Sequence, residues 1–266
     1  GGRHQTSMTG DIEQRLSEIT VDPSTVEMPE VSEEEEASKT SALPDADGSV
    51  LQPANVTYET SLSIQGRTIN LTTDRSIATA MHEGDEVWQV VDKVSSPMLN
   101  ATDSLMLDRA TLRPVARTAK GQGTITLSYA DDAITGSMQM GSQSMDINKE
   151  LDAPVLAGGS GLEMTLATLP LEDGYATTMR VFNYQQQSVR RMKVAVTGTS
   201  TVEVGAGSFD TMTLEVTSLD GNDAGTGTYH VMADAPHHVV KAEQKLGAQM
   251  GGGTATVELT AVGSGE

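Results

Sequence analysis

The most constraining feature of this 266-residue chain is a period-two alternation of apolar and polar side chains, which recurs in short segments from Ser49 to Val262. Successive side chains of a β-strand point to opposite faces of a sheet, so this alternation is typical of strands with one buried face. Turn-forming stretches such as Leu219-Asp220-Gly221-Asn222-Asp223 separate the segments. The pattern predicts an all-β fold with one or two short helices, in which a curved antiparallel sheet forms an open or partly closed β-barrel.

The alternation also places individual elements. The first hairpin is predicted from Val56 to Leu71, with its turn at Gln65-Gly66. The segments Val189 to Val196 and Thr199 to Val204 are predicted as two strands. One stretch breaks the rhythm, and we expect Gly161 to Leu171 to be a short helix placed over an end of the sheet.

The chain divides into four predicted parts. Residues 1–20 hold a short amphipathic helix, from Thr9 to Ile19. Residues 21–48 form an acidic linker that we expect to be disordered, because it cannot bury enough apolar surface to offset its ordering entropy. The antiparallel β domain spans 49–262, and residues 263–266 form a tail.

Charge and composition exclude several partners. The formal net charge is -20, with 37 acidic and 17 basic residues. Nucleic-acid binding requires clustered Lys and Arg that neutralise phosphates, so no nucleic-acid partner is predicted. No stretch is apolar for long enough to cross a bilayer, so no transmembrane segment is predicted. Cysteine is absent, which excludes disulfides and thiolate chemistry.

Motifs that carry catalysis are not found. A serine hydrolase places its nucleophile in Gly-x-Ser-x-Gly between a strand and a helix. The nearest string, Gly205 to Phe209, misplaces the serine and is expected to be a turn between strands. We therefore expect a protein that is not an enzyme and needs no cofactor. The enzyme hypothesis would need a deep pocket that joins His230 or His82 to two carboxylates.

Candidate metal ligands do not converge either. His237 and His238 are adjacent, so strand alternation places them on opposite faces. Asp220, Asn222 and Asp223 cluster hard oxygens, but their loop lacks the downstream acidic ligand of an EF-hand. Turn stabilisation by side-chain acceptors explains these residues. No metal site is predicted.

Methionine takes the place of aromatic residues in this chain, with 14 Met against two Phe and one Trp. Because methionine is flexible and polarisable, a concave sheet lined with it suits an irregular apolar ligand. The predicted apolar lining is Trp88, Met138, Met140, Leu162, Leu166 and Met179. The alternative is that methionine fills gaps in a fully packed core, and both interpretations stay open.

Several phrases occur together in a characteristic order. They are Asp103-Ser104-Leu105-Met106-Leu107-Asp108 running into Ala110-Thr111-Leu112-Arg113-Pro114, Leu169-Pro170-Leu171 before Gly174-Tyr175, Val204-Gly205-Ala206-Gly207-Ser208-Phe209-Asp210-Thr211, and Tyr229-His230-Val231 leading to Val239-Val240-Lys241. With them the chain from Ser49 to Val262 resembles the bacterial extracytoplasmic domain of unknown function 3108 family. The resemblance implies an exported or lipid-anchored domain with a curved sheet like that of lipoprotein carriers of the Gram-negative envelope. It also implies a helix near the mouth of a half-barrel, with Leu162 to Leu169 as the covering element.

Two functions follow as hypotheses. The first is a non-enzymatic domain of the periplasm or cell envelope that binds an apolar or lipid-like ligand in the concave face of its sheet, which assumes that a signal sequence has been removed. The second is an accessory or structural interaction domain, tethered to a partner or to an upstream module, whose N-terminal helix docks through Ile12, Leu16 and Ile19. A filled sheet without a cavity favours the second hypothesis, and an open Met-lined trough favours the first.

Overall fold

The computed structural model describes residues 43–248 and 251–265, which form a β domain around one α-helix. The first strands are β1 Ala54–Ile64, β2 Arg67–His82, β3 Asp85–Ser95, β4 Asn100–Asp108, β5 Pro114–Lys120, β6 Thr124–Tyr129, β7 Ala133–Met140 and β8 Gln143–Glu150. The remaining strands are β9 Leu156–Ala157, β10 Ala176–Asn183, β11 Ser188–Val204, β12 Gly207–Ser218, β13 Gly227–Met232, β14 Val239–Lys245 and β15 Thr254–Ser264. The helix is α3 Ser160–Thr168, and the short 3-10 helix η1 Gly48–Val50 precedes β1.

All 15 strands belong to one sheet, in the order β8-β7-β6-β5-β4-β3-β2-β1-β15-β14-β13-β12-β11-β10-β9. Neighbours are antiparallel, apart from the short parallel pair of β9 and β10. Within the described residues the outer strands β8 and β9 do not pair with each other, so the sheet is open. The predicted all-β class with an open, curved antiparallel sheet is confirmed.

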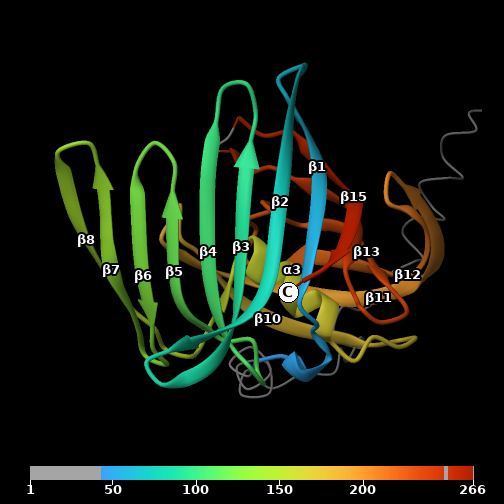
Figure 1. The fold of residues 1–266 in the computed structure, drawn as a ribbon, viewed down its shortest axis with the longest axis horizontal. Helices are drawn as coiled ribbons and strands as arrows, with labels where there is room; N and C mark the ends of the chain where they lie inside the picture. The colour runs from blue at the N-terminus through green and yellow to red at the C-terminus, as the bar shows by residue number, and fades with distance from the viewer. Residues whose placement is uncertain (1–42, 249–250, 266) are drawn as a thin grey trace, which may run out of the picture. The chain divides into compact units, whose positions relative to one another are not determined.

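The sheet has two arms that meet at β1 and β15, near the middle of the strand order (Figure 1). We call β1–β8 the front arm and β9–β15 the back arm. The register between β1 and β15 shifts between Thr57 and Tyr58. A second shift lies between Val196 and Gly198 of β11. Such bulges bend a strand and increase its local twist, which suits a sheet that curves back over its own concave face.

Helix α3 lies between the two arms (Figure 1). Eight of its nine residues are buried, and Glu163 is the exception. An all-round buried helix must satisfy its polar side chains internally. The hydroxyls of Thr165 and Thr168 do so by donating to the carbonyls of Gly161 and Met164 at 2.9 and 3.0 Å. The helix ends before Pro170, because proline disfavours helical backbone in the residue that precedes it.

The position of α3 corrects one expectation. The helix was expected to cover an end or the mouth of the sheet, but it fills the middle of the concave face. Leu162 and Leu166 belong to a core cluster with residues of the back arm, and Met164 belongs to a cluster with Trp88 and Leu105 of the front arm. A helix whose apolar side chains point to two opposite sides gains more by burial between two sheet faces than by covering one edge.

Other differences concern boundaries. The predicted first hairpin is confirmed, with Ile64 paired to Arg67 across the turn. The two strands predicted over 189–204 are instead one strand, β11, whose bulge at Val196/Gly198 interrupts the alternation without ending the ladder. Strand β15 continues to Ser264, into the predicted tail.

The predicted N-terminal helix and residues 21–42 of the predicted linker lie outside the described residues. The last part of the linker range, 43–48, is packed on the domain. Leu43 and Ala46 contact the core beside α3, and the backbone N–H of Asp47 donates to the carbonyl of Thr168 at 3.0 Å. The packed structure therefore starts several residues earlier than the predicted boundary at Ser49.

Candidate functional site

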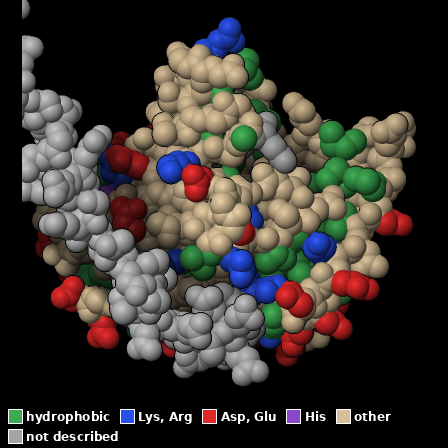
Figure 2. Space-filling view, turned by 180° about the vertical axis from the view of Figure 1, so that it is seen from behind, with side chains coloured by type: hydrophobic (Ala, Val, Ile, Leu, Met, Phe, Trp, Pro, Cys, Tyr) green, Lys and Arg blue, Asp and Glu red, His purple; other side chains and the backbone are tan. Residues whose placement is uncertain are grey.

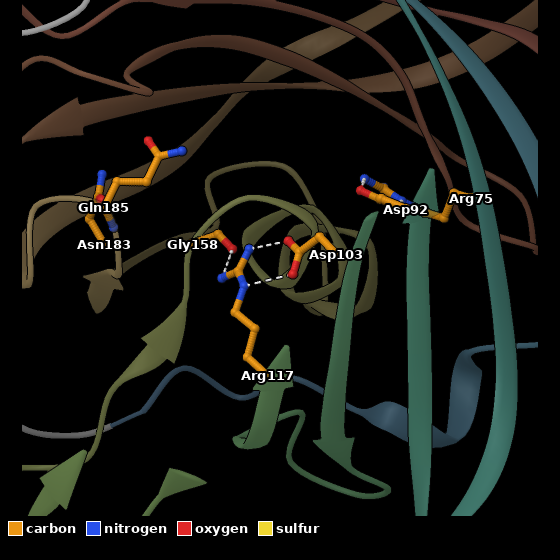
Figure 3. A network of polar contacts seen from close by, with 7 residues as sticks. All are labelled: Arg75, Asp92, Asp103, Arg117, Gly158, Asn183 and Gln185. Atoms are coloured by element: carbon orange, nitrogen blue, oxygen red, sulfur yellow. Dashed lines mark hydrogen bonds and ion pairs between the residues drawn. The ribbon is translucent and has the colours of Figure 1, made fainter. Parts of the chain in front are cut away.

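A row of charged side chains crosses the concave face of the front arm. Arg75 of β2 lies directly opposite Asp92 of β3, and Asp92 lies directly opposite Asp103 of β4. The Arg75 guanidinium donates to both oxygens of Asp92 at 2.6 and 2.8 Å and to Glu163 of α3 at 2.5 Å. Arg117 of β5 donates through Nε to Asp103 at 2.9 Å and through Nη2 to its other oxygen (Figure 3). Each aspartate of this ion-pair row is held by an arginine from the strand beside it.

The carboxylates keep both buried guanidiniums charged. Burial alone would lower the pKa of Arg75, but Asp92 and Glu163 raise that pKa well above its usual value. Burial likewise opposes the charge of Arg117, whereas its hydrogen bonds to Asp103 raise its pKa. Buried ion pairs need such paired geometry, because an unpaired buried charge is strongly unfavourable. Through Arg75 the row ties β2 and β3 to Glu163 of α3, and through Arg117 it ties β4 to β5.

Beyond the ion-pair row the concave face of the front arm is open. A cavity of ≈470 Å³, which we call the front groove, lies over β3–β7. Its apolar lining is Val94, Leu99, Ala101, Ala119, Ile125 and Met140. Seen from behind, hydrophobic side chains gather on the side of the domain where β6–β8 lie (Figure 2).

The strand alternation explains this apolar wall. Val94 follows Asp92 by two residues, Ala101 precedes Asp103 by two, and Ala119 follows Arg117 by two, so each shares the concave face with the charged residue next to it. The alanines and the nearby glycines are too small to fill the space above the ion-pair row. The front groove is therefore what remains where α3 no longer covers the sheet.

The floor of the front groove is polar. It is formed by Asp92, Asp103 and Arg117 of the ion-pair row, by Gly158–Gly159–Ser160 at the start of α3, and by Asn183–Tyr184–Gln185 at the end of β10. Figure 3 shows Arg117 between Asp103 and Gly158. Arg117 Nη1 donates to the Gly158 carbonyl at 3.1 Å, and its guanidinium carbon lies 4.1 Å from the centre of the Tyr184 ring. The floor is thus fixed by side chains that reach it from both arms.

Helix α3 begins without a side-chain cap. Its N-cap residue, Gly159, has φ +67°, a conformation that favours glycine, and a Cβ there would lie 3.3 Å from Arg117 Nη2. The Ser160 hydroxyl is buried and has no hydrogen-bond partner in the described part of the chain. The first-turn N–H groups of a helix have no intrahelical acceptor. Ser160 and the uncapped start of α3 are therefore part of the lining of the front groove.

The predicted apolar lining divides into two groups. Trp88, Leu162, Leu166 and Met179 are buried in the packed core around α3, and Trp88 Nε1 donates to the Gly48 carbonyl at 3.0 Å. Met140 lines the front groove and is 50% exposed. Met138 is paired across the strands with the groove residue Ile125. Of the six residues, Met140 therefore lines the front groove, Met138 shares its face of β7, and the other four are buried around α3.

The histidines of the described residues do not line the front groove. His230 Nδ1 is 3.2 Å from the Ser200 hydroxyl and 3.3 Å from that of Thr213. Burial lowers the pKa of His238 to about 4. Neither His230 nor His82 lines the front groove. Among the residues that the structure describes, no group of three or more acidic or histidine side chains is placed to hold a metal ion.

Sequence reasoning missed the charged residues of the site. Their positions in the strands could have indicated that they point inward, because Asp92 shares a face with Trp88 and Val90, which are buried. Arg117 likewise alternates inward with Ala119 on β5. An inward charge on a strand indicates either a partner or a functional position.

Comparisons with known proteins give a family and distant structural likenesses. No curated protein matches the sequence. A beta-barrel-like protein of the domain of unknown function DUF1849 from Brucella abortus is 10% identical, with 85% of this chain and 100% of that chain covered and a TM-score of 0.44. A candidate exported protein with a YmcC-like fold from Bacteroides fragilis is 12% identical, with 84% and 98% covered and a TM-score of 0.31. A candidate lipoprotein from Parabacteroides distasonis is 10% identical, with 83% and 97% covered and a TM-score of 0.28.

No helix in the described part of the chain combines the length and apolar character needed to span a membrane. The model of the family described as "Protein of unknown function (DUF3108)" matches residues 55–260, from the second residue of β1 into β15. This match spans most of the chain and agrees with the resemblance carried by the sequence phrases. The protein belongs to the DUF3108 family.

Proposed function

We propose that this domain is a non-enzymatic binding domain that acts outside the cytoplasm and holds an apolar or lipid-like ligand in the front groove. The observation that carries the proposal is the front groove itself. It has a volume of ≈470 Å³ and an apolar wall formed by residues of β3–β7 beyond the ion-pair row. Ligand pockets typically have volumes of about 300–1,000 Å³. The groove is therefore large enough to take a good part of one small amphiphile.

The chemistry of the groove favours a ligand with two ends. Burying a methylene group contributes about 0.8 kcal/mol, so an alkyl chain on the wall of Ile125 and Met140 gains affinity with each carbon that it adds. The polar end would meet Ser160 and the uncapped start of α3. This division explains why apolar and polar residues occupy separate parts of the groove.

The ion pairs of the charged residues that line the groove support a function without catalysis. Asp92, Asp103 and Arg117 in the groove floor are engaged in ion pairs across the strands. A general base must be able to reach the proton that it removes. Carboxylates that already accept two hydrogen bonds from an arginine suit a positioning role better than proton transfer.

The test is binding of a neutral fluorescent apolar probe, N-phenyl-1-naphthylamine, to the purified full chain. We expect saturable binding and displacement by straight-chain alcohols, with affinity rising about fourfold per added methylene until the groove is full. Ile125→Glu should weaken binding at least about tenfold, because it places a carboxylate on the apolar wall. Thr126→Glu is the matched control, since Thr126 lies on the same strand and is exposed on the other face.

Saturable binding that Ile125→Glu weakens and Thr126→Glu leaves intact supports the proposal. The absence of probe binding, together with native mass spectra free of co-purified lipid, would favour the accessory-domain hypothesis. The location is tested separately by fractionating cells of the source organism, and recovery in the cytoplasmic fraction would contradict it.

A further inference from the structure

Arg190 of β11 is a buried cation without a carboxylate partner. The residue is 6% exposed, and it forms no ion pair among the described residues. Its Nη2 donates to the Asn222 carbonyl at 2.6 Å, whereas its buried Nε has no hydrogen-bond partner in the same part of the chain. Arg75 and Arg117, the other arginines as deeply buried, each form two hydrogen bonds to an aspartate.

Arg190 lines a second cavity, of ≈190 Å³, which we call the Arg190 cavity. Gly158, Gly159 and Leu162 at the N-terminal end of α3 line it as well. The positive end of the helix dipole and a buried arginine without a carboxylate partner thus line the same space. A guanidinium has a planar fork of donors that matches the oxygens of a phosphate or a carboxylate.

The other charged groups around this cavity are engaged. Lys245 lines it and lies 3.5 Å from Asp223 at the surface. Glu163 lines it too, but its carboxylate accepts from Arg75. Asp220, which acts on Arg190 from a distance, accepts from the backbone N–H groups of Arg191 and Asn222. Arg190 is the buried cation at this cavity whose charge the described chain leaves without direct compensation.

We propose that the Arg190 cavity binds a small oxyanion, a phosphate, sulfate or carboxylate group held by the Arg190 guanidinium and by the start of α3. This site does not require an apolar ligand in the front groove. The two cavities nevertheless share Gly158, Gly159 and Asn183 as lining residues, so the oxyanion is either a free ion or the head of an amphiphile.

Isothermal titration of the purified full chain with inorganic phosphate, sulfate and acetate at constant ionic strength tests the proposal. We expect phosphate to bind with a Kd on the order of 1 mM, because the net charge of -20 opposes an incoming anion. Arg190→Gln should weaken binding at least about tenfold, which is the usual effect of losing a charged hydrogen bond. Arg191→Gln is the matched control, since it removes the same charge from the exposed neighbouring residue.

Arg190→Lys keeps the charge but loses the fork, and it decides the matter if Arg190→Gln does not fold by circular dichroism. A folded Arg190→Lys protein that binds phosphate as tightly as the wild type overturns the proposal. So does a wild type that binds none of the three anions, or an equal loss in Arg190→Gln and Arg191→Gln.

Hexyl phosphate separates the two sources of the oxyanion. Hexyl phosphate binds more tightly than phosphate if the oxyanion is the head of a groove ligand. Ile125→Glu should then remove the difference in affinity between the two and leave phosphate binding unchanged. If both bind alike and Ile125→Glu changes neither, the site takes a free anion and the groove proposal is judged by its own probe experiment.

Discussion

The guanidinium of Arg75 donates two parallel hydrogen bonds to the carboxylate of Asp92, at 2.6 and 2.8 Å, and its Nη1 donates to Glu163 of α3. Arg75 and Asp92 are directly opposed on neighbouring strands. Through this contact the helix is fixed to the front arm of the sheet. The same contact holds Asp92, which lines the front groove.

Asp92→Asn should lower the free energy of unfolding by about 3 kcal/mol, because it leaves part of the buried Arg75 charge uncompensated. Urea denaturation monitored by circular dichroism measures the change. Asp74→Asn is the control, since Asp74 is the exposed neighbour of Arg75 on the same strand, and it should change stability by less than about 0.5 kcal/mol. Equal effects of the two substitutions would show that the row adds nothing to stability.

Leu166→Ala tests the role of α3 as the filling of the concave face. Leu166 is 0% exposed, and its truncation leaves a cavity between the arms. We expect a loss of about 2–5 kcal/mol, the range for a buried leucine. Met145→Ala on the edge strand β8, where the side chain is 54% exposed, should cost much less. A small effect of Leu166→Ala would mean that the helix is only loosely held.

His238 should make the domain sensitive to mild acid. Burial lowers its pKa in the folded protein to about 4, from 6.5 for an unperturbed histidine. Below pH 6.5 the unfolded chain takes up a proton that the folded protein refuses, so stability present at higher pH is lost as the pH falls towards 4. The loss contributed by this histidine should reach about 3 kcal/mol.

His238→Leu should remove this component. Compared with the wild type, the variant should lose about 2 kcal/mol less of its unfolding free energy between about pH 7.5 and about pH 5. Urea denaturation at the two pH values gives the difference. His82→Gln, at the end of β2, serves as the control for removing a histidine that lies outside the core. A parallel pH dependence in wild type and His238→Leu would rule out the role of His238.

The residue pattern alone predicted the strands, because each strand carries its own alternation. The hairpin from Val56 to Leu71 and the helix predicted over 161–171 depend on local turns, on periodicity and on Pro170. The hairpin is confirmed, and the helix spans Ser160–Thr168. The alternation predicts a strand boundary at the β11 bulge, Val196/Gly198, because a bulge interrupts the alternation in the same way as a turn.

The groove was only partly predictable. Met138 and Met140 were placed correctly on one face, because residues two apart on a strand share a face. Trp88, Leu162, Leu166 and Met179 were assigned to the same lining, yet they are core residues around α3. Periodicity says which side of a strand is buried, but it does not say what buries it.

The sequence by itself determined the β class, most strand positions and the face on which each side chain lies, because these properties follow from backbone geometry over a few residues. Only the tertiary structure decided that α3 fills the concave face, that Arg75 meets Asp92 and Glu163, and that Arg190 is left facing a cavity. Those relationships join residues far apart in the chain, so they depend on strand order and on the curvature of the sheet, which no local pattern encodes.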